Sequence, residues 1–213
     1  MARAFAQIAF TPNVLAKQAN HGSANGYAKL LSPDVNGGDR LTDSETVFIS
    51  TIDGFYQSTV SETGWPYVQF RGGPAGFLKV IDDRTIAYAD FRGNRQYLSV
   101  GNLTGDDRVS LILMDYANQR RLKIWGRAKL VSAEDDPELI AQLHLEAYKA
   151  KPERAVVIHL EAFDWNCPQH IPRRFTKGQL EAFLSPVREE IDHLRAENAQ
   201  LKGQLKTSGV QPS

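Results

Sequence analysis

Residues 121–131 form the segment that most restricts how this chain can fold. Small or apolar residues on one side alternate with mostly basic ones on the other: Leu122, Ile124, Gly126, Ala128 and Leu130 against Arg121, Lys123, Trp125, Arg127 and Lys129. Strict alternation over this length is typical of a strand with one face against a core and one toward solvent. The chain must therefore build a β-sheet, and that sheet needs further strands.

Further strand patterns occur at short spacing on both sides of this segment. Runs rich in β-branched and aromatic residues, separated by turn residues, lie at 54–61, 65–71, 77–81, 85–89, 108–116 and 155–163. Helix patterns lie at 42–52, where Thr42 and Glu45 have capping-box spacing, and at 94–102 and 137–149. Because most strands are linked by hairpin turns, the sequence predicts a closed β-barrel of roughly six strands. The fold class is mainly β with flanking helices (α+β).

Composition restricts the partners of the chain. Basic and acidic residues both number 25, so the formal net charge is zero and no overall field attracts nucleic acid. The single cysteine, Cys167, cannot form an intramolecular disulfide and fits a reducing compartment. The N-terminus has no secretory-signal pattern, and no run approaches the ~18 apolar residues of a membrane helix. We expect a cytoplasmic protein with neither nucleic-acid nor membrane partners.

The C-terminal segment has the strongest local pattern. Ser185 and Pro186 are typical of a helix start, and a heptad spacing follows, with Ile191, Asn198 and Leu205 at a positions and Val187, Leu194 and Leu201 at d positions. A single asparagine at an a position favours a parallel two-stranded coiled coil. The alternative is an amphipathic helix folded against its own barrel. We divide the chain into an N-terminal arm lying over the body (residues 1–41), a barrel (42–183), this helix (184–206) and a frayed tail (207–213).

Two short runs combine arginine, an amide side chain and glycine at strand ends. They are GWPYVQFRGG (residues 64–73) and ADFRGNRQY (residues 89–97). Arginine matches phosphate with planar, bidentate donors, and a helix beginning at Asn94 would add unpaired N–H groups. We expect Arg71 and Arg95 to hold an anionic ligand together. The alternative is that both arginines are surface ion-pair partners.

The order of these motifs, followed by VSLILMDY, RRLKIWGRAKL and WNCPQHIPRRF, resembles the pyridoxamine 5′-phosphate oxidase-like family of FMN-binding split barrels over roughly residues 42 to 183. The resemblance implies a six-stranded split β-barrel dimer that binds FMN. It also implies that Gln69, Phe70, Arg71 and Gly72 contact the isoalloxazine ring and ribityl chain, that Ala89 and Asp90 line the ribityl side, and that Asn94 and Arg95 bind the phosphate.

Two further positions depend on the resemblance alone. Arg121 stands where the family has a glutamine that reaches the flavin of the opposite subunit; alternatively it is a solvated outward residue. His170 stands where a flavin-facing tryptophan usually lies; alternatively it is a turn histidine held by prolines.

The sequence also departs from true pyridoxamine phosphate oxidases. Tyr148 and Arg154 lack the spacing of the family's substrate-phosphate set, and the serine that should follow is absent. The terminal substrate motif is replaced by the heptad segment. We therefore expect a homodimer that binds one FMN per subunit. Its FMN would oxidise or reduce a small molecule, either a substrate or an electron donor, whose identity the sequence does not give, and we do not expect vitamin B6 phosphates to be the substrate. No catalytic residue stands out. The alternatives are a non-catalytic FMN carrier or sensor whose coil docks a partner, or a deazaflavin or haem protein of the same fold.

Overall fold

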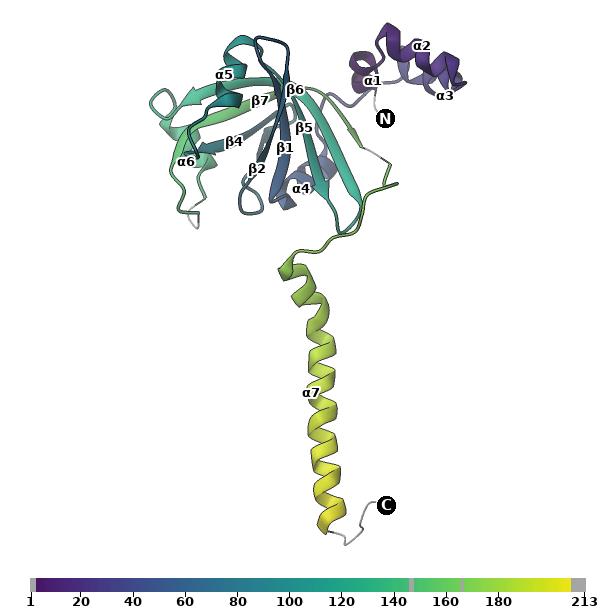
Figure 1. Cartoon of the computed structure of the whole chain (residues 1–213), viewed down its shortest axis with the longest axis vertical. Coiled ribbons are helices and arrows are strands. Elements are labelled where there is room, and N and C mark those ends of the chain that lie inside the picture. The colour runs from purple at the N-terminus through teal and green to yellow at the C-terminus, as the bar shows by residue number, and fades with distance from the viewer. Residues whose placement is uncertain (1–2, 146–147, 166, 208–213) are drawn as a thin grey trace. The chain divides into compact units, whose positions relative to one another are not determined.

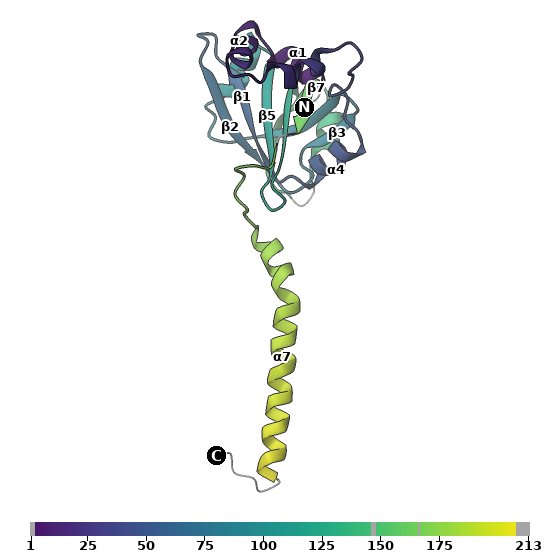
Figure 2. The same cartoon turned by 90° about the vertical axis from the view of Figure 1, so that its right-hand side faces the viewer.

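The computed structural model describes residues 3–145, 148–165 and 167–207. The chain forms two compact units, Met1–Ile171 and Pro172–Ser213. The first unit contains the sheet and its flanking helices, and the second contains one long helix (Figures 1 and 2). In the described part of the chain, no helix is both long enough and apolar enough to cross a lipid bilayer.

The first unit is built on one antiparallel sheet. Its strands are β1 (Gly54–Val60), β2 (Pro66–Gly72), β3 (Lys79–Asp82), β4 (Thr85–Phe91), β5 (Arg108–Asp115), β6 (Arg120–Ser132) and β7 (Pro152–Trp165). They lie in the order β2-β1-β5-β6-β7-β4-β3. The predicted α+β class and split-barrel architecture are confirmed, but the structure has seven strands rather than six.

The expected closed barrel is wrong, because the sheet stays open between its two edge strands. β3 has four residues, pairs with β4 and shifts register between Val80 and Asp82. Among the described residues no backbone ladder joins β3 to β2. Side chains instead connect strands that are not neighbours: the Tyr88 phenol on β4 donates to Gln57 Oε1 on β1 at 2.8 Å, and both side chains are fully buried.

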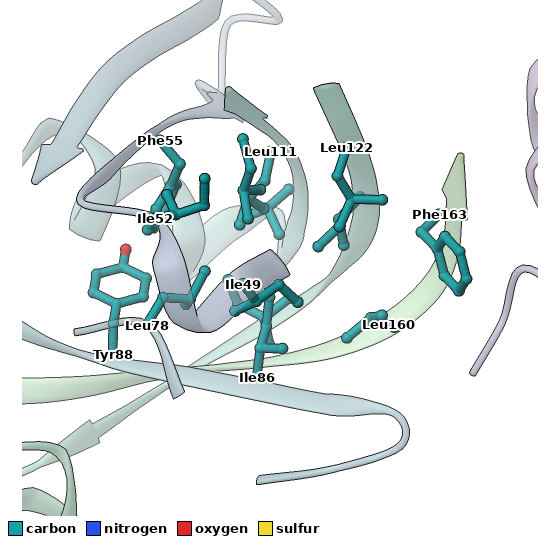
Figure 3. Packing of buried hydrophobic residues seen from close by; sticks show 14 of the residues in the cluster. Ile49, Ile52, Phe55, Leu78, Ile86, Tyr88, Leu111, Leu122, Leu160 and Phe163 are labelled. Carbon is teal, nitrogen blue, oxygen red and sulfur yellow. The ribbon is translucent and has the colours of Figure 1, made fainter. Parts of the chain in front are cut away.

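The alternation that predicted β6 is confirmed. Leu122 and Ile124 are fully buried, whereas Arg121, Lys123 and Trp125 on the opposite side are only partly buried. Figure 3 shows apolar side chains from α4 and the curved strands meeting in one interior, among them Ile49, Phe55, Ile86, Leu111 and Leu122. On the outer side, the N-terminal segment partly covers β6.

That N-terminal cover consists of short helices: α1 (Arg3–Ala9), α2 (Pro12–Asn20), α3 (Ala24–Ala28) and the 3-10 turn η1 (Lys29–Leu31). The ring of Phe5 in α1 stacks on Trp125 at 4.3 Å between centroids. Phe5 and Ala6 are consequently buried, so α1 lies against the sheet, whereas α2 and α3 have no buried residues.

The helix α4 (Asp43–Thr51) follows from its predicted capping box. The Glu45 carboxylate accepts hydrogen bonds from the Thr42 N–H at 3.0 Å and from the Trp165 Nε1 at 2.6 Å, so it also ties the helix start to the end of β7. The helix α6 (Pro137–Leu143) is shorter than the predicted 137–149, and its buried residues Ile140 and Leu143 pack with Ala87 and Ala89 of β4 and Ala155 of β7. Residues 146–147 lie outside the described residues.

Two predicted helix starts are wrong. The helix α5 (Leu98–Gly105) begins after Tyr97 rather than at Asn94. The helix α7 (Lys177–Thr207) begins well before Ser185 and carries Pro186 inside it. An overlooked capping box sets this second start: Thr176 Oγ1 accepts from the Gln179 N–H at 3.2 Å, and the Gln179 side chain accepts from the Thr176 N–H at 2.9 Å.

Candidate functional site

Strand β2 presents three polar side chains to the inside of the curved sheet. Successive residues of a strand point to opposite faces, so Tyr67, Gln69 and Arg71 share one face. This face lies against the segment that leaves β4 and enters α5. An open pocket of ≈ 260 Å³ lies between them, and five of the residues singled out from the sequence line it: Gln69, Arg71, Asp90, Asn94 and Arg95.

A nearly buried ion pair connects the two sides of this pocket. Arg71 Nη1 lies 2.7 Å from Asp90 Oδ1, and the side chains are 15% and 8% exposed. Arg154 Nη1 approaches the other carboxylate oxygen at 3.7 Å. Because charges with so little solvent persist only when paired, Asp90 holds β2 and β7 to β4. The ion-pair alternative is therefore present at Arg71, but inside the pocket rather than on the surface.

Hydrogen bonds orient the polar groups around the ion pair. The Ser99 hydroxyl at the start of α5 donates to Gln69 Oε1 at 2.8 Å, which fixes the amide of Gln69. Deeper in the sheet, burial raises the pKa of Tyr88 above its ordinary value, so its phenol stays protonated and donates to Gln57. The site is thus organised before any ligand arrives.

The loop from Gly93 to Tyr97 adopts an uncommon backbone conformation. Arg95 (φ 65°) and Tyr97 (φ 53°) lie in the left-handed region, which costs a non-glycine residue roughly 1–3 kcal/mol. Asn94 Oδ1 accepts from the Gln96 N–H at 3.1 Å, so the asparagine closes a turn. This turn is the physical reason that the helix does not begin at Asn94.

The first residues of α5 line the pocket in place of the helix start expected at Asn94. Leu98, Ser99 and Val100 are all at the pocket wall. The N-cap residue, Tyr97, makes no side-chain capping hydrogen bond. First-turn N–H groups without a cap are available to an anion.

Arg95 differs from Arg71 in its availability. Its side chain is exposed at the pocket, and it has no side-chain hydrogen bond or ion pair to any part of the chain that the structure describes. Arg71, by contrast, is engaged by Asp90, although its Nε is buried without a hydrogen-bond partner among the described residues. Arg95 is therefore the accessible cation of the pocket, and Arg71 is a buried cation behind it.

Three other residues implied by the resemblance do not line the pocket. Phe70 points to the opposite face of β2, where its ring lies so close to Gly72 that an added Cβ there would stand 2.8 Å from the ring. Gly72 is thus needed beneath Phe70. Ala89 is buried in the cluster beneath α6. The side-chain alternation of β2 and β4 accounts for these placements.

Arg121 and His170 also lie outside this pocket. Arg121 is on the outer face of β6, paired in register with Met114, and its Nε is buried without a hydrogen-bond partner in the described ranges. His170 is exposed, has a φ of 65° and lies in the turn closed by the Ile171 N–H and the Pro168 carbonyl.

The site residues predicted from the sequence did not include several others that line the pocket, among them Tyr67, Tyr97, Ser99 and Glu153. The alternation that joins Gln69 to Arg71 would have found Tyr67. Glu153 comes from β7, and only the pairing of β4 with β7 places it beside Asp90.

A family model described as pyridoxamine 5′-phosphate oxidase matches residues 40–166, which is more than half of the chain. The chain belongs to the pyridoxamine 5′-phosphate oxidase family. The match spans α4, all seven strands and every residue that lines the pocket. No protein with a curated description matches the chain.

Several solved structures are similar to this family member. HupZ from Group A Streptococcus has a TM-score of 0.47 and 16% identity, over 63% of this chain and 99% of that chain. General Stress Protein 26 from Bacillus anthracis has a TM-score of 0.44 and 14% identity, over 56% and 88%. An FMN-binding protein from Syntrophomonas wolfei has a TM-score of 0.42 and 14% identity, over 72% and 97%.

Proposed function

We propose that this pocket binds the phosphate end of FMN, and that the protein is a flavin-dependent oxidoreductase acting on a small molecule. The observation that carries the proposal is the meeting of Arg71 and Arg95, from two separate segments, at one pocket of a chain in this family. Anionic ligands favour such sites because the guanidinium group is always charged and donates in a planar fork.

The donors present fit a phosphate. Arg95 offers an exposed guanidinium without a protein partner among the described residues, Asn94 offers its amide, and the start of α5 offers N–H groups. The strained backbone at Arg95 supports a functional role, since such conformations gather at ligand-binding sites. Arg71 would add positive charge at the buried side of the pocket, where it is already paired with Asp90.

The size of the pocket limits what one chain can hold. Its ≈ 260 Å³ is below the roughly 300–1,000 Å³ of sites that enclose a whole drug-sized ligand. The pocket therefore suits the phosphate and part of the ribityl chain, and the ring would extend beyond it. We propose that a second copy of the chain completes the site, and Arg121 and His170 would contribute only across such an interface.

An exposed apolar surface supports a homodimer. Tyr56, Phe70 and Ile112 are direct cross-strand neighbours on the outer faces of β1, β2 and β5, and each is at least 37% exposed. Contiguous apolar surface of this kind is typical of interfaces. This apolar surface lies on the outer face of the sheet, whereas Gln69 and Arg71 point from β2 to the inner face. Arg121 is on the same outer face, on β6.

In this account the bound FMN supplies the hydride or electron transfer. The residues of the chain bind and orient. Arg95 and Asn94 hold the phosphate, the Ser99-fixed amide of Gln69 sets the position of the ligand along β2, and the Asp90 ion pair keeps the two pocket walls together.

The test is the absorption spectrum of the purified full chain, before and after addition of FMN. The proposal predicts the yellow spectrum of oxidised flavin, release of FMN on denaturation, and turnover with a nicotinamide donor and an acceptor such as oxygen. A haem or deazaflavin spectrum, or a colourless protein that ignores added FMN, would overturn it. Bound FMN without turnover on any donor would instead identify a carrier.

A further inference from the structure

The helix α7 carries an apolar stripe that is exposed along its described length. Val187, Ile191, Leu194, Leu201 and Leu205 each have about half of their surface exposed, between 41% and 51%. Their spacing of four and three residues places them on one side of the helix. A stripe of large apolar side chains on a solvated helix is stabilised by burial against a partner.

The structure lengthens this stripe beyond what the sequence pattern indicated. Because α7 begins at Lys177, Leu180 and Leu184 fall at the d and a positions of a preceding heptad. Pro186 occupies a c position, away from the stripe. The run of a and d residues thus extends from Leu180 to Leu205, a more favourable length for helix pairing than the segment after the proline alone.

The residues beside the stripe are separated by charge. From Val187 to Leu205 the e positions are all basic, namely Arg188, Arg195 and Lys202, whereas the g positions are Glu190, Glu197 and Gln204; in the preceding heptad, e is Glu181 and g is Phe183. Positions e and g are those that form salt bridges between the helices of a coiled coil and decide partner and orientation. Of these e residues, Arg195 forms an exposed pair with Asp192 at 3.4 Å within its own helix, which solvent keeps weak.

This separation discriminates between orientations. In a parallel, in-register pair each g residue faces the e residue of the next heptad in the other helix, so Glu190 meets Arg195 and Glu197 meets Lys202, twice over. In an antiparallel pair e faces e and g faces g, so arginine meets basic residues and glutamate meets glutamate. Like charges in opposition disfavour that arrangement.

Asn198 adds a second constraint at an a position. Its amide is satisfied in an apolar seam only when it meets the amide of an identical residue, which requires two helices in the same direction and register. We propose that α7 pairs with α7 of a second copy of this chain, in parallel and in register, as a two-stranded coiled coil. This contact is independent of the flavin site.

Disulfide trapping in the full-length chain tests the proposal. In a Cys167→Ser background, which removes the native thiol, Leu205→Cys places a thiol at an a position and Gln200→Cys places one at a c position outside the seam. Cysteines at facing a positions lie within the Cα separation of about 4.4–6.8 Å that a disulfide needs. Under mild oxidation, Leu205→Cys should give covalent dimers rapidly and Gln200→Cys should not.

Charge reversal provides the second arm. Adding Glu190→Lys and Glu197→Lys to the Leu205→Cys protein should reduce trapping to the level of the Gln200→Cys control. Mixing it with a Leu205→Cys protein that carries Arg195→Glu and Lys202→Glu should restore trapping, as mixed dimers. Equal trapping of Leu205→Cys and Gln200→Cys, or no preference for mixed dimers, would overturn the parallel self-pairing of α7.

Discussion

Replacing Asp90 by Asn tests whether the ion pair at the pocket holds the edge strand β2 to β4. The substitution preserves the shape of the side chain and removes its charge. Arg71, 15% exposed, and Arg154, 17% exposed, then lose the carboxylate that lies between them. Arg154 retains Glu153 at 3.0 Å, so the main loss falls on Arg71.

The expected cost follows from this geometry. Removing one partner of a buried ion pair costs about 3–5 kcal/mol, because the other charge stays buried without compensation. The residual exposure of both guanidinium groups places Asp90→Asn near the lower end, about 3 kcal/mol. For a domain of this size that corresponds to a fall of about 6–12 °C in melting temperature.

The assay is thermal unfolding of the apoprotein, followed by circular dichroism, with Asp106→Asn as the matched control. Asp106 also pairs with an arginine, Arg108, but that guanidinium is 70% exposed, so the melting temperature of the control should be unchanged. If Asp90→Asn has the same melting temperature as the wild type, the ion pair does not hold β2 to β4, and other contacts must keep the two pocket walls together.

Two further predictions concern the sheet and its helices. Glu45 is buried, which disfavours its charged form, but hydrogen bonds from Thr42 and Trp165 outweigh burial and lower its pKa below the ordinary 4.5. Its contribution to the free energy of unfolding is therefore present above pH 4.5 and is lost as the pH falls through the lowered pKa. In urea unfolding, the stability of Glu45→Gln should depend less on acid than that of the wild type, and an identical dependence would contradict this. Gly126→Ala should lower the free energy of unfolding by about 1–3 kcal/mol, because the added Cβ would stand 2.4 Å from the His159 carbonyl oxygen. Gly101→Ala, in an open part of α5, should raise the free energy of unfolding by about 0.5–1 kcal/mol. Equal effects of the two substitutions in the same unfolding assay would refute the packing argument.

The sequence predicted most strands because side-chain alternation is a local property. In β6 the burial of Leu122 and Ile124 and the partial exposure of Arg121 follow directly from that pattern. The start of α7 was equally local, since Thr176 and Gln179 have capping-box spacing, but the nearby proline at residue 186 is the more familiar start signal.

The missing parts of the site depend on contacts that are distant in sequence. Nothing near Glu153 indicates that it reaches a pocket made by β2 and the start of α5; the β4–β7 register places it there. The left-handed conformation of Arg95 and Tyr97 is likewise imposed by the surrounding fold against the local preference of both residues, which moved the start of α5 away from Asn94.

The affinity for FMN of two arginine variants tests the central claim most directly. Arg95→Asn removes the exposed guanidinium and keeps a residue that tolerates a positive φ. Arg92→Asn removes the same charge from the same loop, at a residue outside the pocket lining. A charge-assisted hydrogen bond contributes about 1.5–3 kcal/mol, so Arg95→Asn should weaken FMN binding about 10- to 150-fold. Arg92→Asn should bind FMN nearly as the wild type does, and an unchanged dissociation constant for Arg95→Asn, or an equal loss in both variants, would contradict the account.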